Sequence, residues 1–236
     1  MSQEMKLRFN EIVISCLKKN FTLIEDQLPE DIKHKKVERG GKVTEAKHIE
    51  FHTDKFYKVK FAEINAEDLI YIRTCVIAPT DDYDFPVFSY DFSEAKKYLF
   101  LISDMHPLRR TPEYMAKYIA PLKSLHEESK KIPFVEGARQ SAVEWAKEFE
   151  SGSGMYLRCP KEYEEKVESL FQGYLDIYIS IVKNAEKISS PSVKDEIIKH
   201  KNYYKNTYRE KDPGFGPMKA LFGEEWAKRS FENFPF

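Results

Sequence analysis

The sequence has few cysteines and lacks the short motifs that mark a resident metal or nucleotide. Its three cysteines, Cys16, Cys75 and Cys159, are widely spaced and odd in number, which argues against a disulfide framework and against a zinc or iron–sulfur site. It has no Gly-rich phosphate loop, no G-x-S-x-G, no H-E-x-x-H and no C-x-x-C. The Gly214-Phe-Gly216 run is too short for a dinucleotide fingerprint. We therefore expect no bound metal, nicotinamide or flavin.

Long apolar runs and an excess of either charge are also missing. No stretch approaches the roughly 20 apolar residues that a membrane span needs, and the N-terminus carries no signal-peptide core. The formal net charge is −1, so the overall charge does not favour nucleic-acid binding. We expect a soluble, cytoplasmic protein that binds neither membranes nor nucleic acid. Nothing in the sequence demands a dimer, so we expect a monomer.

Aromatic residues, in contrast, are abundant. The chain has 236 residues, of which 42% are hydrophobic, with 17 Phe and 14 Tyr. This length suits one domain, and we expect a single domain over residues 1–236. The aromatic content suits a large core, which is the commoner use of such residues, or a flat apolar ligand pocket.

The first half of the chain predicts an antiparallel sheet after one helix. Residues 3–21 carry apolar residues at helical spacing. Alternating, β-rich segments follow, with a turn at Gly40-Gly41. Three further runs within 70–107 are separated by Pro and Asp clusters and predict three consecutive strands. Together they make about five or six strands joined by short turns.

The second half of the chain is predominantly helical in pattern. Helical spacing recurs around 115–125, 139–149 and, after Pro160, over a long segment to about 182. A short strand at 155–159 is placed to return to the sheet edge. A penultimate helix precedes Asp212-Pro213, which we interpret as the N-cap and first residue of one final helix. The order predicts an α+β protein, a three-layer α/β/α sandwich with a central antiparallel sheet.

Two aspartates stand out by their sequence context. Asp91 lies among Val87, Phe88, Tyr90 and Phe92, where an acid is costly unless it is used or paired. Asp212 precedes the final helix. The ordinary interpretations are a solvated strand residue and a helix cap. From the residues alone, both remain open.

The histidines give little chemistry by pattern. His48 and His52 fall on one strand face, but a third ligand is missing, so we interpret them as polar surface residues and not as a metal site.

Two blocks of sequence carry a family resemblance. The run CVIAPTDDYDFPVFSYD (75–91), followed by YREKDPG (208–214), LFGEEWA (221–227) and Phe234, resembles the ferredoxin-dependent bilin reductases. The likeness spans roughly residues 50–236 and is strongest in these blocks. It implies an enzyme that reduces biliverdin IXα with single electrons from ferredoxin, through protein-bound tetrapyrrole radicals. It also implies no bound cofactor, with reduced ferredoxin as the external electron donor, and a bilin held between the sheet and the C-terminal helices.

The resemblance gives both aspartates a role. Asp91 falls on the family's sheet aspartate and Asp212 on the aspartate before the last helix, so both become candidate proton donors. An aspartate desolvated beside a bilin should have a raised pKa, because burial disfavours the charged form. It can then carry a proton near neutral pH and release it as the bilin gains an electron.

One departure from the family bears on the product. In relatives that make phycocyanobilin, a histidine lies seventeen residues before the sheet aspartate, and here that position is Thr74. A threonine hydroxyl does not titrate near pH 7. The resemblance therefore implies four-electron reduction through 15,16-dihydrobiliverdin to phycoerythrobilin, with Asp91 giving the first protonation and Asp212 serving the A-ring step. Reduction to phycocyanobilin, or only to 15,16-dihydrobiliverdin, stays an alternative.

Further residues of the bilin pocket follow from the resemblance. Glu63 lies near the family's pocket glutamate. Arg158 resembles a strand arginine of the family, and Lys130 sits where relatives carry a propionate-binding arginine, with Arg139 as another option. The ordinary interpretation of each cation is a solvated charge. Cations on such a rim would also attract an acidic ferredoxin.

Two other classes of protein fit the same composition. A bilin- or haem-binding carrier without chemistry suits the aromatic interior equally well, and a plain interaction domain would match the two blocks by chance. Two acids on different elements favour proton delivery over a carrier.

Overall fold

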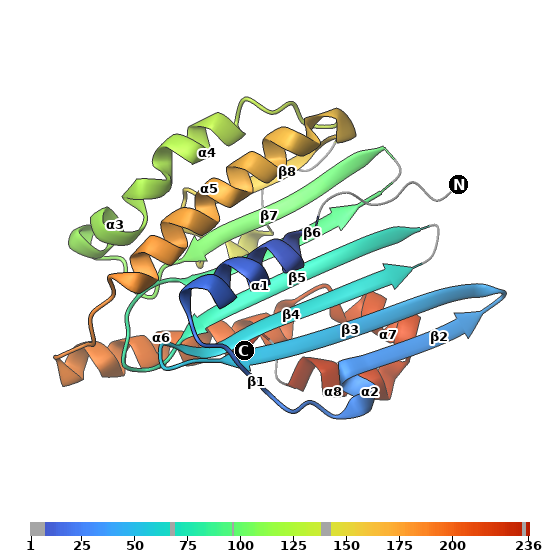
Figure 1. Cartoon of the computed structure of the whole chain (residues 1–236), viewed down its shortest axis with the longest axis horizontal. Coiled ribbons are helices and arrows are strands. Elements are labelled where there is room, and N and C mark those ends of the chain that lie inside the picture. The colour runs from blue at the N-terminus through green and yellow to red at the C-terminus, as the bar shows by residue number, and fades with distance from the viewer. Residues whose placement is uncertain (1–7, 67–68, 96, 138–142, 233–234) are drawn as a thin grey trace.

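A large antiparallel sheet forms the centre of the protein. The computed structural model describes residues 8–66, 69–95, 97–137, 143–232 and 235–236 (Figure 1). The sheet has eight strands in the order β1-β3-β4-β5-β6-β7-β8, with β2 paired to β3. Every strand pair is antiparallel. The strands are β1 (Ile24–Glu25), β2 (His34–Arg39), β3 (Lys42–His52), β4 (Phe56–Ala66), β5 (Ile70–Pro79), β6 (Val87–Glu94), β7 (Tyr98–His106) and β8 (Met155–Pro160).

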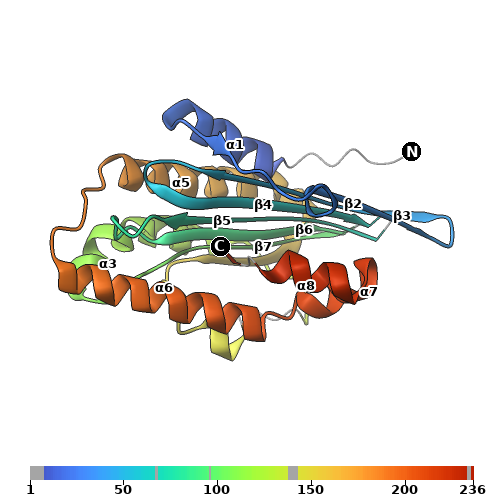
Figure 2. The same ribbon diagram turned by 90° about the horizontal axis from the view of Figure 1, so that it is seen from below.

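Helices cover both faces of this sheet. Figure 2 shows α1 and α5 on one side and α6, α7 and α8 on the other. The helices are α1 (Phe9–Asn20), α2 (Glu30–Lys33), α3 (Pro112–Tyr118), α4 (Lys123–Ser129), α5 (Glu164–Lys183), α6 (Pro191–Lys211), α7 (Phe215–Phe222) and α8 (Glu224–Glu232). Short 3-10 turns occupy Ala120–Leu122, Glu144–Ala146 and Lys161–Tyr163. The predicted three-layer α/β/α sandwich is confirmed.

The face under α1 and α5 is a sealed aromatic core. The ring of Phe9 on α1 lies with its centroid 4.4 Å from the Phe92 ring on β6 and 4.4 Å from the Phe171 ring on α5. All three residues have no exposed surface. Each such ring removes a large apolar area from water, which is the main force holding the layers together. Most of the predicted aromatic interior is on this side.

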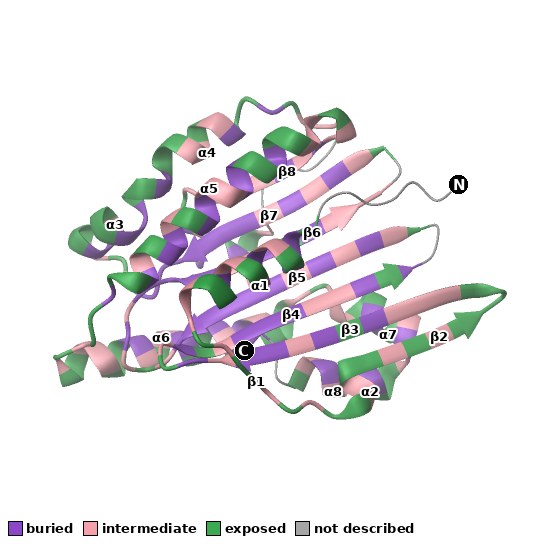
Figure 3. Cartoon of the chain, in the orientation of Figure 1, coloured by how far each residue is buried: buried purple, intermediate pink, exposed green. Residues whose placement is uncertain are grey.

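The opposite face of the same strands is only partly covered. Along β5, β7 and β8, buried residues alternate with incompletely buried ones (Figure 3). Because side chains alternate between faces, the incompletely buried set points toward α6, α7 and α8. The set is Ile72, Thr74, Phe100, Ile102, Tyr156 and Arg158, with Asp91 of β6 more exposed still. We call this incompletely covered region around Asp91, between the sheet and the C-terminal helices, the pocket (Figure 2).

This pocket closes toward one end of the sheet. There the residues on the same face are buried, among them Ala78, Val87 and His106. The rings of Tyr204 and Tyr208 on α6 pack over His106, with centroids 5.4 Å and 6.3 Å away. The other end, at the β4–β5 and β6–β7 turns, carries an open depression of about 770 Å³. Its lining includes Leu69, Tyr98 and Pro160.

The structure departs from prediction in three places. The single final helix is wrong, because the chain breaks at Gly223 into α7 and α8. Of the helix predicted over 139–149, residues 138–142 lie outside the described part, and the rest has only the turn Glu144–Ala146. The short elements β1 and α2 were not predicted, since neither is long enough to show a hydrophobic period. The returning strand at 155–159 is confirmed as β8.

Gly223 enforces the break between α7 and α8. Its backbone has φ 94° and ψ 157°, a region that is accessible essentially to glycine alone. We predict that Gly223→Ala lowers the free energy of unfolding by about 1–3 kcal/mol, measured by urea denaturation. Gly216→Ala, in open space within α7, is the matched control and should leave stability within about 1 kcal/mol. Equal effects of the two substitutions would contradict a conformational role for Gly223.

Candidate active site

Asp91 lies at the centre of the partly open face. It occupies the fifth position of the eight-residue strand β6 and is paired in register with Thr74 on β5 and Ile102 on β7. Paired residues in an antiparallel sheet share a face, so Asp91 and Thr74 are direct neighbours. Thr74 in turn pairs with Ala62 of β4. The acid is therefore flanked by one hydroxyl and by apolar groups.

The environment of Asp91 favours its neutral form. Burial, and to a smaller extent the charge of the Asp212 carboxylate, raises the pKa of Asp91 to about 7. The side chain is nevertheless accessible to solvent, because it faces the pocket and not the sealed core. An accessible acid surrounded closely by protein can hold a proton at neutral pH and pass it to a ligand in the pocket.

Asp212 ends α6 on the same side of the sheet. Its carboxylate Oδ1 accepts a hydrogen bond from the Gly214 backbone N–H at 2.6 Å. Burial raises the pKa of Asp212, and the Gly214 hydrogen bond opposes this shift. The predicted N-cap is wrong: Asp212 is the C-cap of α6, and Gly214 occupies the N-cap position of α7 without a side-chain cap. The Asp212 side chain thus stabilises the turn that joins α6 to α7.

Tyr204 and Tyr208 lie on α6, about two turns and one turn before Asp212, and cover the closed end of the pocket. Their rings stack with centroids 4.3 Å apart, and their hydroxyls share a hydrogen bond. Burial raises the pKa of Tyr208, with Asp91 and Asp212 among the charges that raise it further. The sequence marked both tyrosines only as apolar positions of a helix. Their spacing of one helical turn puts them on one face, but the pattern does not reveal what that face covers.

A serine and a histidine lie beside Asp91 and were not singled out from the sequence. Ser89 precedes Asp91 by two residues on the same strand face, and its Oγ lies 2.8 Å from Nε2 of His106 on β7. His106 Nδ1 lies 3.1 Å from the Phe149 carbonyl oxygen. The only available signal was that Ser89 and Asp91 share a face.

Arg158 is the cation that the structure brings to this face. It pairs with Phe100, which pairs with Ser93 on β6, so it points to the same side as Asp91. Its guanidinium lies over the Tyr98 ring, 4.6 Å from the centroid. Among the described residues its buried Nε has no hydrogen-bond partner. A buried donor without a partner is costly, and it suits an anionic group of a ligand.

Glu63, expected in the pocket, lies on the other face. It pairs with Arg73, whereas Thr74 pairs with Ala62, so Glu63 and Asp91 point to opposite sides of the sheet. Its Oε1 accepts from Asn10 Nδ2 at 3.2 Å and lies 3.5 Å from Arg73 Nε. The expectation of a pocket role for Glu63 is wrong, because a shift of one residue in a strand exchanges the faces.

The remaining predicted cations do not join this site. Lys130 is exposed at the end of α4 and pairs with Glu127 at 2.9 Å. That helix packs on α5 and β8, so the expected propionate contact of Lys130 is not supported. Arg139 lies outside the described residues.

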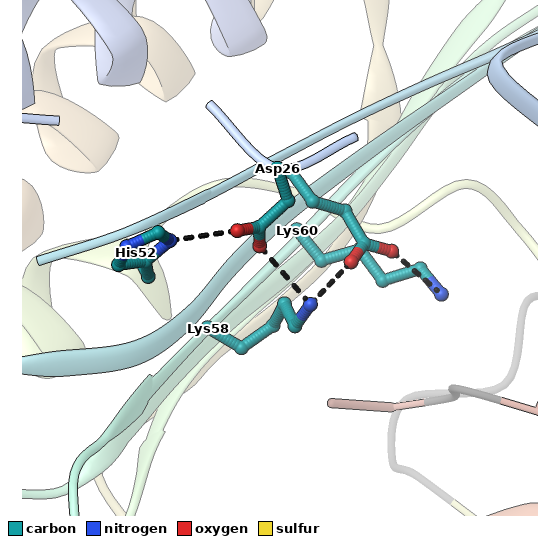
Figure 4. Close-up of polar contacts among 5 residues, drawn as sticks. Asp26, His52, Lys58 and Lys60 are labelled. Carbon is teal, nitrogen blue, oxygen red and sulfur yellow. Dashed lines mark hydrogen bonds and ion pairs between the residues drawn. The ribbon is translucent and has the colours of Figure 1, made fainter. Parts of the chain in front are cut away.

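Charged side chains of alternating sign lie along β3 and β4 on the face of Asp91. Asp26 contacts His52 at 2.6 Å and Lys58 at 3.2 Å, and Glu50 lies between Lys58 and Lys60 (Figure 4). Burial lowers the pKa of Lys60, and Glu50 opposes that shift. The alternating signs satisfy buried charges along β3 and β4.

Both histidines of β3 have protein partners, and the interpretation of His48 as a polar surface residue is wrong because it is buried. His48 Nδ1 lies 2.8 Å from the Ile32 carbonyl oxygen, while His52 contacts Asp26. Within the described residues, no group of three or more His, Cys, Asp or Glu side chains is arranged to hold a metal ion. The described helices also include none that is long and apolar enough to cross a membrane.

Two acids with raised pKa values lie on one side of the sheet, and ionisable groups with shifted pKa values cluster at functional sites. Comparison with known proteins gives the family. Residues 10–236 match the family described as ferredoxin-dependent bilin reductase. The chain therefore belongs to the ferredoxin-dependent bilin reductases and is an oxidoreductase.

Individual relatives agree with this assignment. A 15,16-dihydrobiliverdin:ferredoxin oxidoreductase of Nostoc punctiforme is 27% identical over 97% of this chain and 93% of its own length. A phycoerythrobilin:ferredoxin oxidoreductase of Gloeobacter violaceus is 26% identical with the same coverage. The crystal structure of tomato phytochromobilin synthase in complex with biliverdin matches with a TM-score of 0.82 at 19% identity, covering 96% of this chain and 80% of that one. At that identity the likeness concerns the fold.

The raised pKa of Asp91 has a consequence for stability. The unfolded carboxyl loses its proton near pH 4, whereas the folded one keeps it until about pH 7. Wild-type stability should therefore fall between pH 4 and pH 7, and the charge penalty should be fully present above pH 7. We predict that Asp91→Asn is more stable than wild type at pH 8, and that this difference disappears toward pH 4, measured by urea denaturation across the pH range.

An exposed acid on α6 provides the control. Asp195→Asn removes one charge at a solvated position and should show no comparable growth of the difference with pH. If the stability difference between Asp91→Asn and wild type stayed constant from pH 4 to pH 8, the folded state would not bind the Asp91 proton more tightly than the unfolded state does.

Proposed function

We propose that this enzyme reduces biliverdin IXα by four electrons, first to 15,16-dihydrobiliverdin and then to phycoerythrobilin. Reduced ferredoxin supplies the electrons singly. Each step adds two electrons and two protons across one conjugated bond system and oxidises two ferredoxins. The observation that carries the proposal is the presence of two acids with raised pKa values, Asp91 and Asp212, on one side of the sheet. The family assignment supports the electron source.

Asp91 is the donor for the first reduction. Its pKa of about 7 leaves a large protonated fraction at neutral pH. An added electron makes a bilin more basic, so a neutral carboxylic acid in contact with it can transfer its proton. The position of Asp91 at the middle of the pocket supports contact with the central part of a long pigment.

Asp212 is the donor for the A-ring step. It comes from the helical layer, so it approaches a bound pigment from another direction than Asp91. Two acids on different layers can protonate different carbons of one ligand without moving it. The Gly214 hydrogen bond fixes the carboxylate while leaving its second oxygen for the substrate.

Arg158 is the residue we assign to a propionate of the pigment. Its guanidinium is on the face of Asp91, and a planar guanidinium matches a carboxylate in geometry. It lies two strands away from Asp91, which keeps the propionate apart from the reacting carbons.

A second candidate is a reaction that stops at 15,16-dihydrobiliverdin. It is favoured by the Nostoc relative, whose name specifies 15,16-dihydrobiliverdin and ferredoxin. The Gloeobacter relative specifies phycoerythrobilin instead. Similarity alone therefore leaves both endpoints, and product chromatography separates them.

The two acids give a prediction about intermediates. In an anaerobic assay with biliverdin, reduced ferredoxin and an electron source, we expect Asp91→Asn to slow loss of biliverdin by about 100-fold or more, since the first proton donor is absent. Asp212→Asn should consume biliverdin and accumulate 15,16-dihydrobiliverdin, as resolved by chromatography.

Each outcome of this assay separates the candidates. Formation of phycoerythrobilin by Asp212→Asn at the wild-type rate would exclude the assigned role of Asp212. Wild-type enzyme that halts at 15,16-dihydrobiliverdin would establish the second candidate. An unchanged pigment spectrum with wild-type protein would favour a carrier.

Thr74 gives a prediction about regiochemistry. Thr74 is the direct cross-strand neighbour of Asp91, and a histidine there would add a titrating group beside the donor. We expect Thr74→His to divert product from phycoerythrobilin toward phycocyanobilin, measured by chromatography of the product mixture. Thr74→Val, which removes the hydroxyl at similar size, is the control. An unaltered mixture with Thr74→His would show that position 74 does not direct the outcome.

A further inference from the structure

The Ser89–His106 pair occupies the inner part of the pocket, beside Asp91. Ser89 pairs with Asp104, and His106 pairs with Val87, so both side chains point to the face of Asp91. Ser89 is partly exposed, whereas His106 is buried behind it. The histidine therefore contacts the pocket through the serine.

The partners of His106 determine which atoms carry hydrogen. The Phe149 carbonyl oxygen, 3.1 Å from Nδ1, can only accept, so Nδ1 carries the ring hydrogen. Burial lowers the pKa of His106, and Asp104 opposes this shift, so the ring is neutral at neutral pH. A neutral ring with hydrogen on Nδ1 has a bare Nε2. The Ser89 hydroxyl at 2.8 Å must then donate to Nε2.

Among the described residues, the side-chain partner of the Ser89 hydroxyl is His106 Nε2. Asp104, its neighbour in register, is occupied by the backbone N–H groups of Met105 and Ser151 and by the Ser151 hydroxyl. The rings of Tyr204 and Tyr208 pack against the imidazole and hold it in place. The Ser89 hydrogen is thereby directed inward.

A hydroxyl with its hydrogen committed can offer only lone pairs to the pocket. Ser89 Oγ is then an acceptor fixed two residues from the Asp91 proton donor. The complementary ligand group is an N–H donor, and a linear tetrapyrrole carries such groups on its pyrrole rings. A carbonyl or carboxylate group of a ligand cannot donate a hydrogen bond, so it would not complement Ser89 Oγ.

We propose that Ser89 Oγ accepts a hydrogen bond from a pyrrole N–H of the bound bilin, and that His106 is the positioning residue that orients this hydroxyl. The inference rests on the proposed function, because it assigns one polar contact of that same substrate. It makes Ser89 a binding residue that favours a nitrogen-protonated pigment, while Asp91 supplies the proton to carbon.

The test is a titration of the purified full-length chain with biliverdin, followed by visible absorption. We expect Ser89→Ala to weaken binding about three- to tenfold, as for the loss of one hydrogen bond. It should also shift the long-wavelength band of the bound pigment, because an N–H partner is lost. Ser89→Thr keeps the hydroxyl and should restore both affinity and band position.

Ser93 supplies the matched control. It lies on the same strand and face, two residues beyond Asp91, and Ser93→Ala should change affinity by less than about twofold. If Ser89→Ala and Ser93→Ala have the same affinity and spectrum as wild type, the inference is wrong while the proposed function stands. If wild-type protein does not bind biliverdin, the proposed function itself fails.

A double-mutant cycle tests the positioning role of His106. His106→Phe keeps an aromatic ring against Tyr204 but frees the Ser89 hydroxyl, so it should weaken binding and shift the pigment band. In a Ser89→Ala background the same substitution should have no further effect, since the oriented group is already absent. Additive losses would overturn the positioning role. Thermal unfolding of each variant separates these effects from loss of the fold.

Discussion

The alternation of side chains in one antiparallel sheet is the constraint on which the site depends. Each central strand gives half of its side chains to the sealed core under α1 and α5 and half to the pocket under α6, α7 and α8. Tyr90 and Phe92 are buried on one side, and Asp91 between them faces the other. The sealed face supplies the apolar burial that stabilises the fold. The open face can therefore contain groups that do not favour stability.

The cost of those groups explains their chemistry. Burial favours the protonated form of both acids, and the Asp212 charge adds to this effect at Asp91, whereas the Gly214 hydrogen bond opposes it at Asp212. A position that is poor for a carboxylate is good for a proton donor at neutral pH. Burial also disfavours the charged form of His106, which for a histidine lowers the pKa and leaves the ring neutral. Burial thus favours the neutral forms of Asp91 and His106, while the charge of Arg158 lies two strands away from Asp91.

The sequence allowed the layers to be predicted, because they depend on local pattern, and it singled out Asp91 without deciding its role. Periodicity distinguishes helix from strand, and an acid between aromatic residues is conspicuous. Glu63 was misplaced because the face of a strand residue depends on register to a single residue. Asp212 was taken for an N-cap because Asp-Pro commonly begins a helix, whereas here it ends α6 and its carboxylate accepts a hydrogen bond from the Gly214 N–H two residues later. The Ser89–His106 contact joins residues 17 apart across a strand pair and has no local signature.

The shape of the pocket limits how a long flat ligand can be held. The Tyr204 and Tyr208 rings cover one end of this face, and the depression beside Leu69 and Tyr98 lies at the other end. The Arg158 guanidinium over Tyr98 lies closer to that end of the sheet than Asp91 does. Charged substituents are best retained where water remains, since their desolvation is expensive. On the proposed function, the charged propionates would lie toward Arg158 and the apolar, reacting part of the pigment toward Asp91.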